Sequence, residues 1–210
     1  MSKEARVVSK SIVNTKLVVQ IGMLAAIAVV LMLFEVPLPF APGFYKLDLS
    51  EVPVLIGGFL LGPLAAVGIE FVKIMLNFIM DGTVTAGVGE LANFLIGCSF
   101  CVPAGMIYRK NKTKKGALLG LMGGVGLMTI VGCLLNAFVL LPAYAVAFQL
   151  PIDELIQMGT VINKNITDLT TFVIYVVAPF NLIKGIVVSV VVMLSYKQVK
   201  KGLSSMMSIK

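Results

Sequence analysis

The chain has 210 residues, of which 59% are hydrophobic, and it carries a formal net charge of +7 with no histidine and no tryptophan. So apolar a composition does not fit a water-soluble core, and it indicates a membrane protein with several spans. A nucleic-acid partner is excluded, because it would require a solvated basic face, whereas the lysines cluster between apolar segments.

Helices of about 20 apolar residues are long enough to cross the hydrocarbon core of a bilayer. The apolar segments predict an all-α membrane protein, a bundle of six transmembrane helices that forms a single integral membrane domain over residues 1–210. The predicted helices cover residues 17–34, 52–61, 64–80, 90–108, 116–148 and 169–196.

The number of crossings depends on the second and third predicted helices, which are short and are separated only by Gly62 and Pro63. One kinked span with five crossings in total is the alternative. Six crossings place three basic segments on one side, which the distribution of positive charge assigns to the cytoplasm together with both termini. These segments hold thirteen of the 17 basic residues: Lys3, Arg6, Lys10, Lys16, Arg109, Lys110, Lys112, Lys114, Lys115, Lys197, Lys200, Lys201 and Lys210.

Two small-residue motifs favour packing over chemistry. Cys98 and Cys101 have the spacing of redox and zinc sites, but they lie within a predicted membrane helix without a second ligand pair, so no metal site is expected. Gly116, Gly120 and Gly124 recur every four residues and allow close approach of another helix, which we expect to lie within the bundle and not at a subunit interface.

Polar residues inside four predicted helices recur at spacings of three and four, which places each set on one helical face. Ionisable groups at membrane depth cost about 2.5 to 3.5 kcal/mol on insertion scales, so their positions are informative. Their depths outline a cavity that is closed toward the cytoplasm and open outward. The sets are Glu70, Lys73 and Asn77; Glu90 and Asn93; Asn136; and Asn181 and Lys184.

An internal ion-pair network, with Lys73 paired to Glu70, is the alternative for the third predicted helix. Lys184 has no acid on its own helical face, so we expect a polar ligand to supply acceptors for its ammonium group. The loop over residues 35–51 combines stiffening prolines with aromatic and charged residues, and we expect it to lie over the cavity as a lid.

Six segments, in order over nearly the whole chain, resemble the substrate-binding membrane subunits, or S components, of energy-coupling factor (ECF) vitamin transporters, most closely the riboflavin-specific branch. The segments are Ile21–Ala26, Pro37–Phe40, Tyr45–Pro53, Gly62–Ala66, Asn136–Pro142 and Ala178–Gly185. The resemblance implies a multi-pass protein of the bacterial cell membrane that binds riboflavin from outside with high affinity. A transmembrane coupling subunit and two ATPase subunits would then drive release inward. The chain itself has no GxxxxGK[ST] motif to bind ATP.

Riboflavin is expected as the transported ligand, not as a cofactor, and FMN or another flavin, or a different vitamin, is the alternative ligand. Asparagine amides offer donors and acceptors to its pyrimidine-like edge, and lysine donates to carbonyl or hydroxyl oxygens. The expected substrate-binding residues are Asn136, Asn181 and Lys184 in the cavity floor, Tyr45, Lys46, Leu47 and Asp48 in the lid, and Asn93. The expected contacts with the coupling subunit are Gly22, Ala25, Ala26 and Ala28.

An ion-coupled secondary carrier is the alternative function, in which Glu70, Lys73 or Lys184 would exchange protons. No enzyme is predicted, because the chain has no histidine, no paired metal ligands and no arrangement of nucleophile and base.

Overall fold

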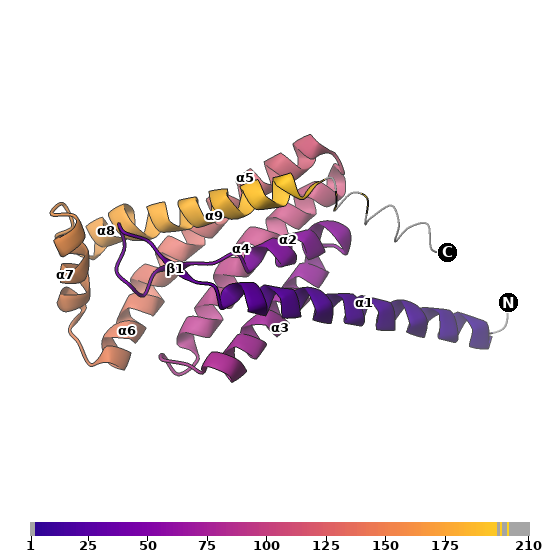
Figure 1. The fold of residues 1–210 in the computed structure, drawn as a ribbon, viewed down its shortest axis with the longest axis horizontal. Helices are drawn as coiled ribbons and strands as arrows, with labels where there is room; N and C mark the ends of the chain where they lie inside the picture. The colour runs from indigo at the N-terminus through magenta and orange to yellow at the C-terminus, as the bar shows by residue number, and fades with distance from the viewer. Residues whose placement is uncertain (1–2, 197, 199–200, 202–210) are drawn as a thin grey trace.

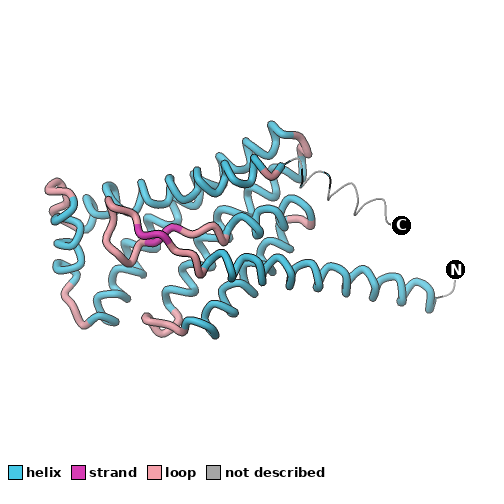
Figure 2. The backbone as a smooth tube through the Cα atoms, in the orientation of Figure 1, coloured by secondary structure: helices cyan, strands magenta, loops and turns pink. Residues whose placement is uncertain are grey.

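The computed structural model describes residues 3–196, 198 and 201, with side chains described from Thr15 onward. This part of the chain is a bundle of helices with one short antiparallel hairpin (Figures 1 and 2). Of the predicted basic segments, Lys197, Lys200 and Lys210 and the side chains of Lys3, Arg6 and Lys10 lie outside the described residues. The elements are α1 (Lys3–Met32), β1 (Val36–Pro37), β2 (Lys46–Leu47), α2 (Glu51–Leu60), α3 (Pro63–Asp81), α4 (Val88–Lys110), α5 (Lys114–Leu135), η1 (Asn136–Leu140), α6 (Leu141–Phe148), α7 (Ile152–Ile162), α8 (Leu169–Phe172), η2 (Val173–Val177) and α9 (Ala178–Leu194), where η marks a π-helix.

The described part of the chain is mostly helical, with five helical segments long and apolar enough to cross a membrane and a sixth, shorter apolar helix in α2. At about 1.5 Å per residue, α2 is only about 15 Å long, half the thickness of a hydrocarbon core. The five long segments are Thr15–Met32, Pro63–Asp81, Val88–Lys110, Lys114–Phe148 and Leu169–Leu194.

The helices α2 and α3 are separate and form a hairpin, so the alternative of one kinked span is wrong. Gly62 ends α2 with a φ of 106°, a value that favours glycine, and Pro63 begins α3 where its missing N–H costs no hydrogen bond. The two helices then pack against each other. The chain therefore enters and leaves this half of the bundle at the same end (Figure 1).

Two of the predicted long helices contain a π-helical segment just before a proline. η1 precedes Pro142 and η2 precedes Pro179, and each proline is the second residue of the helix that follows. Proline cannot donate a backbone hydrogen bond, and a π turn is one way for a helix to continue through such a position. η1 and η2 lie against each other, so the irregular turns of α5–α6 and α8–α9 occur at the same level of the bundle.

Helix α7 lies within a region that the sequence analysis treats as a connection. Its buried residues Leu155, Ile156 and Gly159 face the bundle, and a Cβ on Gly159 would lie 2.9 Å from the Phe172 ring. With 11 residues and Asp153 in its first turn, α7 is too short and too polar for a predicted span. It covers one end of the molecule (Figure 1).

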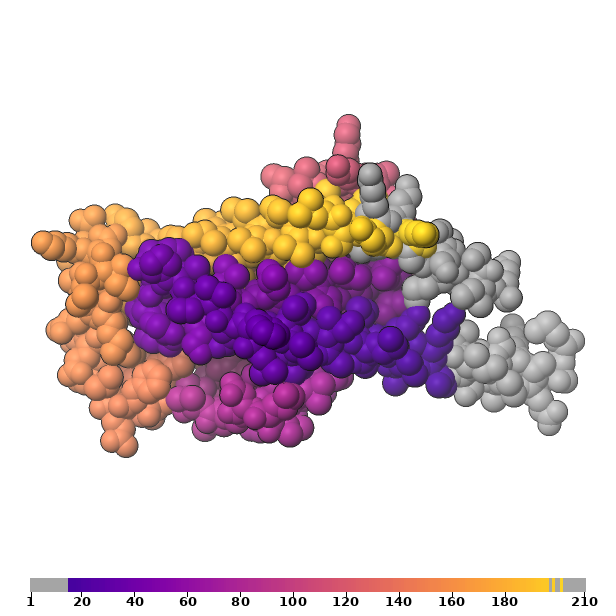
Figure 3. Space-filling view, viewed as in Figure 1, coloured from indigo at the N-terminus to yellow at the C-terminus, as the bar shows by residue number. Residues whose placement is uncertain are grey.

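Apolar packing forms two clusters, one toward each end of the bundle. We call the end that carries the α4–α5 connection the inner end, and the end that carries α7 the outer end. The inner core joins α1, α2, α3, α4, α5 and α9 and includes Leu55, Phe100 and Leu121. The outer core joins the loop of residues 33–50 to α6, α7 and the α8–α9 segment, and includes Tyr45 and Phe172. The space-filling view shows this loop packed against the α6–α8 region (Figure 3).

The first and last long helices of the described chain both reach the inner end of the bundle. α1 begins and α9 ends there, and the connection between α4 and α5 lies there too (Figure 1). The loop of residues 33–50 and helices α7 and α8 lie at the opposite, outer end. The three basic segments of the sequence are therefore attached to one end of the described bundle.

The glycines of α5 allow it to pack closely on α4, which confirms the expected contact within the bundle. A Cβ on Gly120 would lie 2.7 Å from the carbonyl oxygen of Ala104, and one on Gly124 would lie 2.5 Å from that of Phe100. Backbone atoms cannot move aside as a flexible side chain can. Glycine is therefore required at both positions.

Replacing Gly120 by leucine should lower the free energy of unfolding by about 1 to 3 kcal/mol, because the new side chain overlaps the α4 backbone. Gly123→Leu is the matched control, since Gly123 is exposed and the nearest atom to its Cβ would be the flexible end of Ile107, at 3.3 Å. Thermal unfolding in detergent measures both variants. Equal melting temperatures for the two would contradict the packing argument.

Candidate functional site

A cavity of about 430 Å³ lies in the outer half of the bundle. Its walls come from the loop of residues 33–50, the α3–α4 connection, and α3, α4, η1, α6 and α9. The volume falls in the range of about 300 to 1,000 Å³ that holds small organic ligands. The structure brings together seven of the eight residues predicted to bind substrate: Tyr45, Lys46, Asp48, Asn93, Asn136, Asn181 and Lys184. Leu47 does not line the cavity.

Lys184 has a carboxylate partner, contrary to the expectation that it lacks one. Its Nζ lies 2.8 Å from Oδ2 of Asp48, and the backbone N–H of Ser50 donates to the other carboxylate oxygen, also at 2.8 Å. The acid comes from the loop before α2, 136 residues away in sequence, and not from the helix that carries Lys184. This ion pair connects α9 directly to the lid.

Burial alone would raise the pKa of the Asp48 carboxyl, but the positive charges of Lys184 and Lys73 outweigh it and hold this pKa below its usual range. A lowered carboxyl pKa stabilises the fold above the pH at which the unfolded chain titrates, near 4, and this contribution is lost as the pH falls through the folded-state pKa. The Asp48 carboxyl is therefore ionised at neutral pH.

Tyr45 and Asn136 form a second contact between the lid and the membrane helices. The Tyr45 hydroxyl donates to Oδ1 of Asn136 at 2.7 Å, and the Asn136 amide donates to the carbonyl oxygen of Gly132. Burial raises the pKa of Tyr45, so its hydroxyl stays protonated and remains a donor. Asn181 on α9 donates its amide to the carbonyl oxygen of Val177.

Lys46 lies at the exposed rim of the cavity, in the β1–β2 hairpin. Its Nζ lies 2.6 Å from Oε2 of Glu35, and this hydrogen bond and the charge of Glu35 raise the pKa of Lys46. The pair joins the two ends of the lid loop, since Val36 and Pro37 pair with Leu47 and Lys46. Both side chains are partly exposed, so the pair contributes little to stability.

Aromatic rings form one wall of the cavity. Phe44 lies 5.2 Å from Tyr144 and Tyr45 lies 5.2 Å from Phe180, measured between ring centroids, and Phe148 stacks on Tyr144. The sequence analysis missed Tyr144 and Phe148. Tyr144 and Phe148 lie four residues apart on one face of α6, but the π-helical segment η1 separates them from Asn136, so no regular spacing links them to it.

A buried ion triad of Glu51, Lys73 and Glu70 lies beside the cavity. Nζ of Lys73 lies 2.7 Å from the Glu51 carboxylate and 2.8 Å from that of Glu70, and none of the three side chains is more than 2% exposed. Lys73 also donates to the Ser50 hydroxyl at 3.4 Å, and the Cys101 thiol donates to Glu51 at 3.4 Å. The network alternative for the third predicted helix is thus correct for Lys73 and Glu70, while Asn77 of the same polar set lines the cavity.

The cysteines carry no bond between them, since Cys98, Cys101 and Cys133 are all free. In the part of the chain that the structure describes, no group of three or more His, Cys, Asp or Glu side chains lies close enough to hold a metal ion.

Only two of the four residues expected to contact a coupling subunit are exposed on the surface of the bundle. Ala25 and Ala28 are fully buried in the inner core, because they face α2 and α3, whereas Gly22 and Ala26 are exposed. A one-residue step along a helix turns a side chain by about 100°, so adjacent small residues do not share a face. The exposed small-residue pair is therefore Gly22 and Ala26.

Residues 16–196 match the family described as the substrate-specific component of ECF transporters. The chain belongs to this family. The riboflavin transporter FmnP of Bacillus subtilis (strain 168) is 35% identical over 89% of this chain and 93% of its own length. The riboflavin transporter RibU of Staphylococcus aureus (strain TCH60) is 38% identical over 88% of this chain and 90% of its own length.

The solved structure of the S component of a bacterial ECF transporter has the same fold, with a TM-score of 0.70 and 36% identity over 90% of this chain and 98% of that one. These relatives are components of transporters and not enzymes. The mostly helical bundle with five or six apolar helices is thus the membrane fold of an ECF S component.

Replacing Lys73 by methionine should lower the free energy of unfolding by about 3 to 5 kcal/mol, because Glu51 and Glu70 would be left buried without a cation. Lys164→Met, at an exposed lysine, is the control and should have no measurable effect. Folded yield and thermal unfolding in detergent measure the loss.

A triple variant with Glu51→Gln, Glu70→Gln and Lys73→Met distinguishes charge balance from packing, and it also covers the case in which Lys73→Met alone does not fold. Because it removes all three charges together, it should be more stable than Lys73→Met. A triple variant that is no more stable would show that charge compensation is not the function of Lys73.

Proposed function

We propose that this protein is the riboflavin-binding subunit of an ATP-driven ECF uptake transporter, and that riboflavin binds in the cavity described above. The observation that carries the proposal is the cavity itself, in which four asparagine amides, a buried ion pair and an aromatic wall converge. The names of the relatives, riboflavin transporters at 35% and 38% identity over most of the chain, support the same ligand.

The chemistry of the cavity suits a flavin. The flat ring system fits beside Phe44, Tyr144 and Phe180, because aromatic faces stack on one another. The amides of Asn136 and Asn181 complement the alternating donors and acceptors of the pyrimidine edge. Lys184 and Asp48 offer a donor and an acceptor to hydroxyl or carbonyl oxygens.

The orientation in the membrane follows from charge. The three basic segments attach to the inner end of the bundle, so this end faces the cytoplasm and both termini lie there, with six helices in the bundle and α2 as the short one. The cavity then opens outward, and the loop of residues 33–50 is its lid. Tyr45, Lys46 and Asp48 act from this lid.

Release inward requires partners, because the sequence holds no phosphate-binding loop. A transmembrane coupling subunit and two ATPase subunits supply the energy. The exposed pair Gly22 and Ala26 on α1 provides a contact at which another helix can approach closely in lipid.

Two measurements test the proposal as a whole. The protein purified from flavin-replete bacteria should be yellow and should show flavin absorption. Reconstituted alone it should bind riboflavin without concentrating it, whereas uptake driven by a proton or sodium gradient would establish the secondary carrier instead.

Asn181→Leu should weaken riboflavin binding about 5- to 150-fold, since losing one partner of a buried hydrogen bond costs about 1 to 3 kcal/mol. Lys184→Met should weaken it to a similar degree. Titration of flavin fluorescence with the detergent-purified variants measures both affinities, and Lys164→Met is the control. Wild-type affinity in both cavity variants would place riboflavin elsewhere.

The double variant Asp48→Asn, Lys184→Met shows whether Lys184 touches the ligand or only holds the lid. If Lys184 donates to riboflavin, the double variant stays as weak as Lys184→Met. If the lysine only neutralises Asp48, removing both charges restores the affinity, because no unpaired carboxylate remains.

Ala26→Trp should block co-purification with the coupling subunit while leaving riboflavin affinity unchanged, because a large side chain prevents close helix approach. Met106→Trp is the control on another lipid-facing helix, since Met106 is 51% exposed on α4. Intact complex formation by Ala26→Trp would move the contact away from α1.

A further inference from the structure

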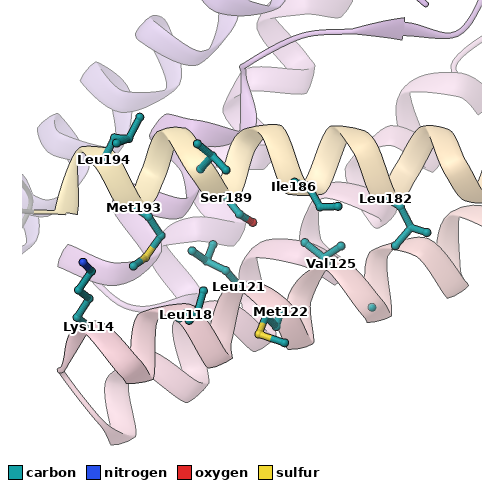
Figure 4. Close-up of a pocket in the computed structure, with 12 residues that line it drawn as sticks. Lys114, Leu118, Leu121, Met122, Val125, Leu182, Ile186, Ser189, Met193 and Leu194 are labelled. Atoms are coloured by element: carbon teal, nitrogen blue, oxygen red, sulfur yellow. The ribbon is translucent and has the colours of Figure 1, made fainter.

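A groove of about 660 Å³ runs between α5 and α9 on the outside of the bundle (Figure 4). It shares no lining residue with the riboflavin cavity. Its residues are apolar except at Lys114 and Ser189, and none is acidic. They are Lys114, Leu118, Leu121, Met122, Val125, Gly126, Leu182, Ile186, Ser189, Val190, Met193 and Leu194.

The groove has a polar end and an apolar end. Lys114 lies at the end formed by Met193 and Leu194, whereas Val125 lies toward Leu182 at the other end (Figure 4). From Lys114 to Gly126 the helix rises about 18 Å, at 1.5 Å per residue. This is a little over half of a hydrocarbon core about 30 Å thick, so the groove spans one leaflet.

Gly126 leaves open space in the groove because it has no side chain. A Cβ on Gly126 would have no heavy atom within 4 Å. At Gly185, by contrast, a Cβ would lie 2.8 Å from Val125, so the two helices touch beside the groove. The hydroxyl oxygen of Ser189 is buried without a hydrogen-bond partner.

Positive charge gathers at the polar end of the groove. Lys114 is the first residue of α5 and Lys115 the second, and both are exposed. The first N–H groups of a helix and its dipole also attract anions there. Basic pockets between membrane helices on the cytoplasmic side are typical sites for anionic lipid headgroups.

We propose that this groove binds one anionic phospholipid, with an acyl chain along α5 and α9 and its phosphate at Lys114 and the start of α5. A phospholipid matches both ends of the groove and its one-leaflet length. A partner helix would need a groove that continues into the other leaflet. That the lipid belongs to the cytoplasmic leaflet rests on the orientation proposed above.

The test compares lipids that share acyl chains and differ in charge. Delipidated protein in detergent is titrated with phosphatidylglycerol or phosphatidylcholine, and bound lipid is counted by native mass spectrometry. Phosphatidylglycerol should bind about fivefold more tightly, the effect of one lysine near the headgroup. Equal binding of the two lipids would overturn the proposal.

Two variants and two matched controls locate the lipid. Lys114→Gln should remove the preference for phosphatidylglycerol, and Gly126→Phe should reduce binding of both lipids by filling the groove. Lys112→Gln changes a lysine in the connection just before α5, and Gly123→Phe changes another glycine of α5. Both residues lie outside the groove, so both variants should bind lipid like the wild type. Wild-type lipid binding in Lys114→Gln and Gly126→Phe would refute the site.

Two further readouts complete the test. Soluble glycerol phosphate should not compete with phosphatidylglycerol, and effective competition would identify a site for a free anion instead. Riboflavin affinity should be the same in all four variants, which separates failure of the lipid site from failure of the proposed function. A variant that lost riboflavin binding as well would show that the substitutions act on the fold and would count against the site.

Discussion

Lys73 is the cation on which the outer half of the bundle depends. It is completely buried on α3 and lies between Glu51, the first residue of α2, and Glu70 on its own helix. Gly97 on α4 leaves room for this triad, because a Cβ there would lie 2.7 Å from the Glu70 carboxylate carbon. Since Glu51 follows directly on the lid loop, the ion pair also fixes where the loop ends and α2 begins. The position of Asp48 in the cavity is therefore set by the pairing of Glu51, three residues further along the chain, with Lys73 on α3.

The sequence predicted the membrane fold and most of the cavity, because apolar runs and polar helical faces are local patterns. Asn136, Asn181 and Lys184 stand out as polar residues within apolar helices. Contacts between distant segments leave no such local pattern, so the pairing of Lys184 with Asp48 could not be predicted. Helix α7 was not predicted for a different reason. Its 11 residues are too few to cross a membrane, and its acidic first turn is typical of a connection between spans.

Glycines control the spacing of α5 and α9, and with it the width of the cavity in the outer half of the bundle. A Cβ on Gly132 would lie 2.8 Å from the Asn181 amide, and the close contact of Gly185 with Val125 lies one turn further along α9. Toward the inner end of the bundle from these contacts, the same two helices border the lipid-facing groove. One helix pair thus presents polar groups toward its outer half and apolar groups toward its inner half.

The loop of residues 33–50, which we propose as the lid, is part of the outer hydrophobic core, since Ala41 and Tyr45 are buried against Leu141, Phe172 and other apolar residues. Opening the lid therefore exposes apolar surface to water, and this surface gives the opening a positive change in heat capacity. Because apolar burial weakens on cooling, the equilibrium between closed and open lid should shift toward the open form in the cold. Under the proposed function, exchange of vitamin with the medium then depends on growth temperature through the hydration of a few aromatic rings.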